Sequence, residues 1–344
     1  MPRRGSIDWP AAASHLAGAF PRSRLDRAVL AWAENSPARE PWLVAFSGGA
    51  DSLALLLLLW AHWPERRRRL RALHYNHRLR GAAARADERF CARVCATLGV
   101  AYRAGVWADA PRQASEAEAR AARQRFFDAE LRRARATALW LGHQLDDVAE
   151  TMLMRLARGS GPAGLAAPRP VQTLAGGRVN LRPLLGIRKM EIVATLAATG
   201  LPWREDATNA GGDYFRNRIR RDVLPAWAEA AQRDALGGAA LSRRLIEEDD
   251  AALDAWLADL APIVKTGALS LRRLAGKPRA LVRRALRQWL AGPAGAGALS
   301  RPAFEALLDD VMVQRRTRHS IGTGQFARIT RAFVVSDRIA PEKI

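Results

Sequence analysis

Short apolar runs alternate with longer segments of helical length and composition along the first half of the chain. Runs of four to seven apolar residues are typical of buried strands. Strands that alternate with helices form parallel sheets, so we expect an α/β fold with a twisted parallel sheet and helices on both faces. The expected strands are Pro41–Phe46, Leu70–Tyr75, Val100–Val106 and Ala138–Gly142, and the expected helices are 22–35, Ala50–Trp63, Ala84–Leu98, Ser115–Ala136 and Leu145–Arg158.

The pattern changes after residue 158. Gly, Pro and Ala dominate Gly159–Gly177, which predicts a mobile loop, and residues 201–225 are polar and irregular. We therefore expect a catalytic α/β domain over 1–225, a helical region over 226–295 and a small C-terminal α+β part over 296–344. Further expected elements are an edge strand over Val179–Leu185, helices over Arg188–Thr199, Leu241–Leu260, Lys277–Leu290 and Arg301–Val313, and β-like pieces at Gln325–Thr330 and Ala332–Ser336.

Charge narrows the range of partners. The chain has 55 Lys and Arg against 34 Asp and Glu, a net charge of +21, which favours a nucleic acid over a membrane surface or mere solubility. The leucine stretch at Leu53–Trp63 is far shorter than the ~20 apolar residues of a membrane span, and the N-terminus lacks the apolar region of a secretory signal. The two cysteines, Cys91 and Cys95, exclude a disulfide framework, fit a reducing cytoplasm and are expected in the core.

A glycine-containing loop, SGGADS, joins the first expected strand to the helix that follows it. Adjacent glycines let backbone N–H groups approach a ligand closely, and the helix N-terminus adds a positive dipole end, so the loop suits phosphate. A carboxylate repels phosphate, so we expect Asp51 to bind a Mg²⁺ that bridges to the phosphates. The loop lacks the lysine of a Walker A motif. The expected phosphate-binding set is Ser47, Gly48, Gly49, Ala50, Asp51 and Ser52.

Two more motifs follow the second and fourth expected strands, and therefore face the same edge of the sheet. They are HYNHRLR at 74–80 and LGHQLDDVAET at 141–151. Asp147 and Glu150 are spaced i, i+3 on one helix face, which suits Mg²⁺ binding or the handling of an amine. The alternative is that they only cap their helix. The three histidines of these motifs are either structural or part of the site, and no Cys/His spacing fits zinc.

Three further segments complete the set of motifs. The first is a helix with Ser115 as its expected N-cap and Glu118 completing a capping box, and it carries Arg120, Arg123 and Arg125. These three arginines cannot all face one ligand. The others are RGSGPAGL at 158–165 and EDATN at 205–209 followed by YFRNRIR at 214–220.

In this order, over residues 42–225, the motifs resemble those of the tRNA(Ile)-lysidine synthetase (synthase) family of PP-loop ATP pyrophosphatases. The chain departs from the family pattern at Tyr75, Arg78, Phe126 and Gln144, and none of these changes removes a charged group that we regard as essential. Beyond residue 225 the resemblance is weak. The resemblance over residues 42–225 implies a PP-loop fold of the adenine nucleotide alpha hydrolase type, with ATP and Mg²⁺ as cofactors.

The resemblance also implies a reaction. Family members ligate free L-lysine to C2 of the wobble cytidine of tRNA(Ile) with anticodon CAU. Cytosine O2 first attacks ATP and releases pyrophosphate, and the lysine amine then expels AMP, which makes the enzyme a C–N ligase. The expected cytoplasmic location rests on the cysteine content, whereas a possible homodimer rests on the family alone.

Each motif residue acquires an expected role in that reaction. The lysine amine has a pKa near 10.4, so a carboxylate must orient it and take its proton. The expected catalytic residues are Asp51, Arg123, Asp147 and Glu150, and Asp51 and Asp147 are expected to bind Mg²⁺. His74 and His143 join the loop as ATP-binding residues, and Asn76, His77, Arg80, Arg216, Asn217, Arg218 and Arg220 are expected to contact tRNA.

Three alternatives stay open. A PP-loop tRNA thiolase needs a sulfur-carrying cysteine, often in C-x-x-C, and this chain has C-x-x-x-C in an expected helix away from the loop. An amidotransferase-type ligase that acts on a small metabolite would need a glutaminase domain or an ammonia source, and the chain shows no nucleophilic cysteine in a suitable context. A non-catalytic RNA-binding protein with an inactive ATP fold conflicts with the intact carboxylates. We further expect residues 226–344 to hold the tRNA, on the evidence of the basic run Arg315–His319 and the resemblance.

Overall fold

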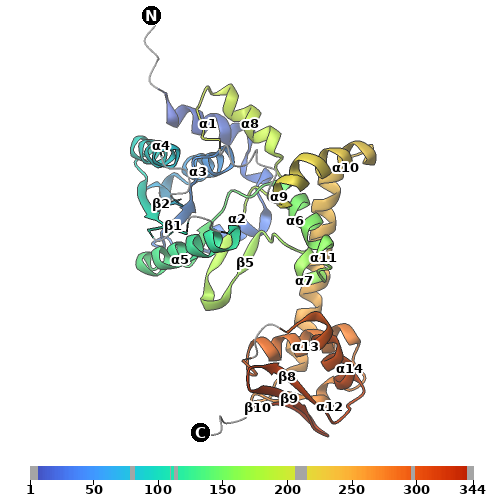
Figure 1. The fold of residues 1–344 in the computed structure, drawn as a ribbon. Coiled ribbons are helices and arrows are strands. Elements are labelled where there is room, and N and C mark those ends of the chain that lie inside the picture. Colours follow the sequence, from blue (N-terminus) through green and yellow to red (C-terminus); the bar gives the residue numbers. More distant parts are fainter. Residues whose placement is uncertain are drawn as a thin grey trace, which may run out of the picture. The chain divides into compact units, whose positions relative to one another are not determined.

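The structure is a computed structural model that describes residues 7–77, 82–108, 110–111, 115–205, 215–295 and 299–338. The chain forms two compact units, residues 1–247 and 248–344 (Figure 1). Each unit is described by itself below. The boundary between the two units, at residue 247, differs from the boundaries at 225 and 295 that we expected from the sequence. The three expected regions remain a prediction.

A six-stranded sheet forms the centre of the first unit, in the order β3-β2-β1-β4-β6-β5. Every neighbouring pair is parallel except β5 and β6, which confirms the predicted fold class. The chain leaves β1 toward β2 on one side and later returns to β4 on the other, so the switch point of the topology lies beside β1. The strands are β1 Trp42–Ala45, β2 Leu70–Asn76, β3 Ala101–Val106, β4 Ala138–Trp140, β5 Val171–Thr173 and β6 Val179–Leu181.

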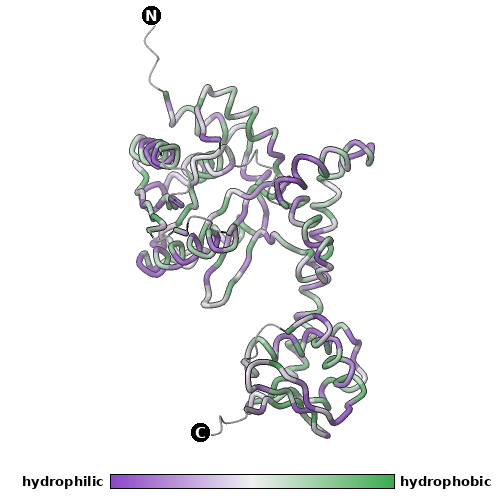
Figure 2. Tube along the Cα trace, in the orientation of Figure 1, coloured by the Kyte–Doolittle hydropathy of each residue, from purple (hydrophilic) through white to green (hydrophobic). Residues whose placement is uncertain are grey.

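Helices cover both faces of this sheet. On one face, the leucine stretch of α3 is buried all round and packs against α1 and α8, while α4 packs on β2, β3 and α1. On the other, Phe127 and Leu131 of α5 pack on Leu43, Leu73 and Leu139 of the strands. Hydrophilic residues are frequent along the outer helices α4 and α5 (Figure 2). The helices are α1 Trp9–Ala19, α2 Arg27–Asn35, α3 Ala50–His62, α4 Ala82–Leu98, α5 Glu116–Ala134, α6 Leu145–Ala157, α7 Pro162–Leu165, α8 Lys189–Ala198, α9 Phe215–Arg218, a π-helical turn Ile219–Val223, α10 Leu224–Ala231 and α11 Ala235–Leu260.

Several predictions from the sequence are corrected by this arrangement. Helix α1 was not expected; Asp8 caps it and Pro10 occupies its first turn. The expected loop at Gly159–Gly177 contains α7 and strand β5, and β5 rather than Val179–Leu185 is the edge strand, because β6 lies between β4 and β5. The expected irregular segment 201–225 is helical from Phe215 onward.

The second unit has a four-stranded antiparallel sheet in the order β7-β10-β9-β8. Its core combines one face of this sheet with helices α13 and α14. The helix α14 and the strands β9 and β10 were expected, and β8 was not. The elements are β7 Leu269–Ser270, α12 Leu271–Leu274, α13 Arg279–Ala291, α14 Arg301–Met312, β8 Arg318–Gly322, β9 Gln325–Ile329 and β10 Phe333–Arg338. Within the described ranges, no helix is both long and apolar enough to cross a membrane.

Candidate active site

The loop Ser47–Ser52 leaves the end of β1 at the switch point and enters α3. Its two serines hold it closed: the backbone N–H of Ser47 donates to Ser52 Oγ at 3.2 Å, and the two hydroxyl oxygens lie 3.0 Å apart. Ser52 Oγ donates to the carbonyl of Gly49 at 3.0 Å. Gly48 has a φ of +88°, which a side chain would strain. The loop is therefore preformed at the N-terminus of a buried helix, as a phosphate site requires.

Both cysteines lie in α4, and one of them lies directly under the loop. A Cβ built on Gly48 would come within 3.0 Å of Cys91 Sγ, so the expectation that the cysteines lie away from the loop is wrong. Both side chains are buried, as predicted. Burial raises the pKa of the Cys91 thiol, and it raises the pKa of the Cys95 thiol to about 12. Both groups are therefore protonated thiols that pack in the core.

Asp51 lies in the first turn of α3 and forms an ion pair that the sequence did not reveal. Lys189 Nζ, at the start of α8, donates to Asp51 Oδ2 at 2.6 Å. The other oxygen, Oδ1, is buried and has no hydrogen-bond partner within the described part of the chain. Burial raises the pKa of Asp51, and Lys189 offsets part of that effect. The signal in the sequence was Lys189 itself, one of four lysines in a chain whose other cations are arginines.

Helix α6 joins the same corner through its first turn. Asp146 Oδ2 accepts the backbone N–H of Lys189 at 2.9 Å and so caps α8. Gly142, just before α6, lies so close to α3 that a Cβ there would come within 2.8 Å of the Asp51 carbonyl oxygen. The LGHQLDD motif is thus packed against the glycine loop, and it fixes the position of Lys189 relative to Asp51.

Asp147 and Glu150 face two arginines from the YFRNRIR motif. Arg216 Nε donates to Glu150 Oε2 at 2.7 Å and its terminal nitrogen binds Asp147, while Arg220 Nε donates to Glu150 Oε1 at 2.5 Å. Glu150 is fully buried. Asp147 also accepts the backbone N–H of Gln144 at 3.0 Å, so it does cap α6, as the alternative interpretation holds, while its second oxygen remains available to the arginines.

His143 is surrounded by arginines. Its Nδ1 accepts a hydrogen bond from Arg182 Nε at 3.0 Å. Burial lowers the pKa of His143 well below the usual value, and the charges of Arg182, Arg216, Arg120 and Arg123 lower it further. His143 is therefore neutral, and its Nε2 carries the proton as a donor.

Arg182 was missed by sequence reasoning, because the stretch around it matched no motif that we singled out. It is buried, and its guanidinium also donates to the Arg169 carbonyl at 2.6 Å and to Gln172 at 3.0 Å. Burial lowers its pKa to about 10, with help from Arg120 and Arg178. Of the three arginines of α5, Arg120 and Arg123 lower the pKa of His143 by their charge. The charge of Arg125 instead offsets part of the rise that burial causes in the pKa of Tyr75.

The remaining predicted residues lie in several places. His74 and Asn76 are buried at the end of β2, where His74 Nδ1 contacts the Phe46 carbonyl at 3.0 Å and Asn76 donates to Glu88 at 2.9 Å. His77 packs edge-on against the rings of Tyr75 and Trp107. Asn217 and Arg218 lie in α9, and Arg218 stacks over Phe215. Arg80 and the residues Asp206–Asn209 fall outside the described residues.

The segment before EDATN reaches the glycine loop from another side. The backbone N–H of Arg204 donates to the Gly48 carbonyl at 2.9 Å, and its Nε donates to Asp87 at 2.6 Å. Arg204 was not predicted as a site residue. Four motifs that are distant in the sequence therefore meet around the end of β1. They are SGGADS, HYNHRLR, LGHQLDDVAET and YFRNRIR.

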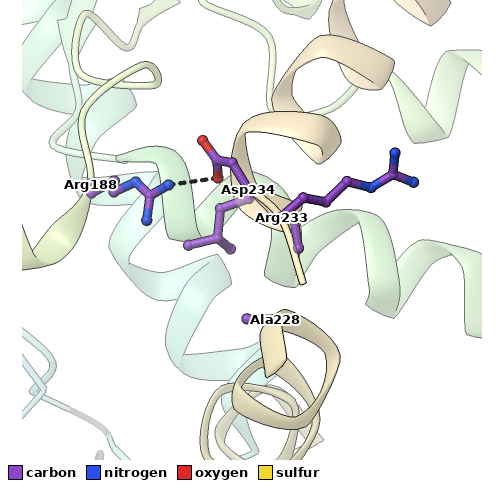
Figure 3. A pocket seen from close by; sticks show the side chains of 6 residues that line it. Arg188, Ala228, Arg233 and Asp234 are labelled. Atoms are coloured by element: carbon purple, nitrogen blue, oxygen red, sulfur yellow. Dashed lines mark ion pairs between the residues drawn. The ribbon is translucent and has the colours of Figure 1, made fainter. Parts of the chain in front are cut away.

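The part of the chain that the structure describes holds no group of three or more His, Cys, Asp or Glu side chains arranged to bind a metal ion. A pocket of about 300 Å³ lies near the start of α8 (Figure 3). Arg188 and Asp234 form an ion pair of 2.6 Å in it. None of the predicted site residues lines this pocket; its lining residues are Arg188, Ala228, Arg233, Asp234, Ala235 and Leu236.

The chain is similar in sequence to known proteins. Residues 21–227 match the model of the PP-loop domain. A tRNA(Ile)-lysidine synthase from Geobacter sulfurreducens is 37% identical over 76% of this chain and 57% of its own length. One from Gloeobacter violaceus is 37% identical over 81% of this chain and 85% of its own length. The chain spans about half the length of several such relatives.

Among solved structures, the chain resembles a U34-tRNA thiolase from Methanococcus maripaludis that was determined with its [4Fe-4S] cluster. The TM-score is 0.50 at 16% identity, covering 69% of this chain and 78% of that one. At this identity the likeness concerns the fold, and it agrees with the parallel sheet described above.

Proposed function

Because the chain belongs to the tRNA(Ile)-lysidine synthase family of PP-loop proteins, we propose that it ligates L-lysine to the wobble cytidine of tRNA(Ile) with anticodon CAU. The observation that carries the proposal is the meeting of four motifs at the end of β1. There Lys189 pairs with Asp51 of the phosphate loop, and Asp147 and Glu150 lie on helix α6, which packs against that loop. A cytoplasmic location and a homodimer belong to the same proposal.

In the first step, ATP lies with its phosphates on the loop. Cytosine O2 attacks the α-phosphorus, the bond to the β-phosphate oxygen breaks, and pyrophosphate leaves. Negative charge then grows on the leaving group, so fixed donors aimed at it lower the barrier. The loop N–H groups, Lys189 Nζ, neutral His143 Nε2–H and Arg123 are the donors that we assign to this task.

Mg²⁺ fits Asp51, because its oxygen Oδ1 is buried and no group in the described ranges forms a hydrogen bond to it. The ion would neutralise phosphate charge and would keep several waters, as one or two protein carboxylates suffice for it. Asp51 would hold it, and Asp147 is the second candidate, since its charge already acts on Asp51.

In the second step, the lysine amine attacks C2 of the adenylated base. The new C–N bond forms, the C2–O2 bond breaks, and AMP leaves with the oxygen. The attacking nitrogen must be deprotonated, so a carboxylate has to accept its proton. We assign this role to Asp147, assisted by Glu150. The substrate ammonium would compete for these carboxylates with Arg220, the more exposed of their two arginine partners.

The thiolase alternative is disfavoured by the same structure. Thiolation needs a reactive thiolate, and both cysteines are buried thiols with raised pKa values. Replacing both by alanine is therefore expected to leave catalysis intact, apart from a loss of stability from two small cavities.

The test measures labelled L-lysine incorporated into an unmodified tRNA(Ile) CAU transcript with ATP and Mg²⁺. Incorporation is expected with the wild-type chain, and it should disappear with Asp51→Ala or when the wobble cytidine is replaced. Asp309→Ala, which removes a carboxylate of α14 that pairs with Arg279 in the second unit, is the matched control and should retain activity. Release of pyrophosphate on another tRNA without lysine incorporation would overturn the lysine assignment and keep the adenylating chemistry.

A further inference from the structure

The sheet of the second unit has two faces of different character. On the inner face, Ile321, Ala327, Ile329 and Val334 are at most 2% exposed and pack against α13 and α14. Side chains alternate along a strand, so the residues between these point to the opposite side. We call that side the outer face; it comprises Arg318 and Ser320 of β8, Phe326 and Arg328 of β9, and Phe333, Val335 and Asp337 of β10.

Two phenylalanines on the outer face are not absorbed into the core. Phe333 is 36% exposed, and Phe326 is half-buried, with the Arg318 guanidinium 3.9 Å from its ring centroid. In the register of the sheet, Phe326 lies opposite Asp337 while Val335 lies opposite Arg328. The two rings are thus separated along the strands by a middle row that contains Val335 and Arg328.

Cations surround these rings. Arg318 and Arg328 lie on neighbouring strands in register with each other, and the exposed Arg331 lies in the turn between β9 and β10. The acid on the face, Asp337, is paired with Arg328 at 2.6 Å. By contrast, His319 of the basic run faces the other way and contacts Asp310 of α14 at 2.9 Å. The outer face is therefore a basic surface with one exposed ring, Phe333, and one half-buried ring, Phe326, that lies against Arg318.

We propose that the outer face binds unpaired nucleotides of RNA. Exposed aromatic rings on an antiparallel sheet stack splayed bases, and arginines beside them bind phosphates or stack on bases themselves. A protein partner would want a contiguous apolar patch, which the arginine row interrupts. The inference rests on the proposed function only in naming a tRNA as the natural source of those nucleotides.

The experiment uses the full chain and a fluorescently labelled single-stranded oligoribonucleotide. Phe326→Leu and Phe333→Leu, made singly and together, keep an apolar side chain but remove the stacking ring. Each is expected to weaken binding about tenfold, whereas Phe326→Tyr and Phe333→Tyr should bind within about threefold of wild type. Arg318→Ala should weaken binding and lower the salt dependence by about one phosphate contact.

The matched control is Arg287→Ala. Arg287 of α13 stacks over Phe304 of α14 at 5.1 Å, a contact of the same kind on the helical side of the unit. This variant should bind RNA like wild type. Thermal unfolding of every variant shows whether weaker RNA binding results from the altered outer face or from loss of the folded structure. Binding by the double leucine variant within twofold of wild type, or equal affinity for an RNA duplex, would overturn the proposal.

Lysine incorporation at saturating tRNA separates this inference from the proposed function. The leucine variants should reach the wild-type rate once tRNA is saturating, with a higher KM for tRNA. If the wild-type chain incorporates no lysine but the leucine variants still bind RNA more weakly, the proposed function is wrong. The proposal that the outer face binds RNA is then still supported. A lower rate at saturating tRNA with unchanged RNA affinity would contradict the outer-face proposal alone.

Discussion

At the scale of single residues, Asp51 combines a stability cost with a proposed role in catalysis. Its oxygen Oδ1 is buried and has no hydrogen-bond partner among the residues that the structure describes, which is unfavourable, and Lys189 compensates for it only in part. Such a group persists where a ligand completes its surroundings. Neighbouring Asp147 and Glu150 differ from it because arginines and a backbone N–H already bind their oxygens.

We predict a pH-dependent stability effect of Asp51→Asn. The pKa of Asp51 is raised on folding, so its ionisation destabilises the folded state above that pKa, while the protonated form carries no penalty. The asparagine variant should therefore unfold at higher urea concentration than wild type at pH 8. The difference should shrink as the pH falls through the raised pKa.

Glu191→Gln is the control of opposite sign. Burial would raise the pKa of Glu191, but Arg24 and Arg188 outweigh it and leave the pKa lowered. This glutamate stabilises the fold above its unfolded pKa, and that stability is lost as the pH falls through the folded value. Its glutamine variant should be less stable than wild type at pH 8. A wild-type chain more stable than Asp51→Asn at pH 8 would contradict the argument.

The two loop glycines give a matched pair of substitutions. Gly48→Ala places a side chain at a φ of +88° and against Cys91, whereas Gly49 has a φ of −70° and its Cβ position is 3.4 Å from the nearest atom. Gly48→Ala should lower the free energy of unfolding by about 1–3 kcal/mol, and Gly49→Ala by much less. Urea titrations of both variants measure this difference, and equal losses would contradict it.

At the scale of elements, the start of α8 ties the lysine to the motif on α6. Asp146 caps α8 through the Lys189 N–H, so Asp146→Ala should cost about 1 kcal/mol and let Lys189 drift from Asp51. We expect a several-fold rise in KM for ATP. Asp8→Ala removes the cap of α1, where Asp8 accepts the Ala11 N–H at 2.9 Å, and should cost similar stability without changing KM. If KM for ATP rose in both variants, general destabilisation would explain the change and the proposed link between Asp146 and Lys189 would be wrong.

The elements that the sequence predicted well are those whose pattern is local. The capping box of Ser115 and Glu118 is present, and the strands β1 to β4 lie where apolar runs predicted them. Strand β5 was missed because it has only three residues and depends on pairing with β6. Lys189 and Arg182 were missed for the same reason: their roles arise from partners 138 and 39 residues away.

At the scale of the whole molecule, the charge of +21 concerns binding more than folding. Many arginines are used internally: Arg216 and Arg220 bind carboxylates, and Arg66 donates to the Ser36 and Pro37 carbonyls. Net charge therefore overstates the number of cations that can reach a phosphate. The surplus still leaves exposed arginines on both units, so RNA affinity should depend strongly on salt.

We predict that tRNA affinity falls by roughly 10³-fold between about 50 and 200 mM salt, as expected for six or more phosphate contacts. Filter binding across a salt series measures the slope of log affinity against log salt. Arg318→Ala should make that slope shallower, because it removes a cation, whereas Phe326→Leu should lower affinity and leave the slope unchanged. Arg318 and Phe326 are in contact as one cation–π pair. The two variants therefore distinguish the contribution of base stacking by Phe326 from that of phosphate binding by Arg318. Equal slopes for all three proteins would show that Arg318 makes no phosphate contact and that its guanidinium serves only to cover the ring.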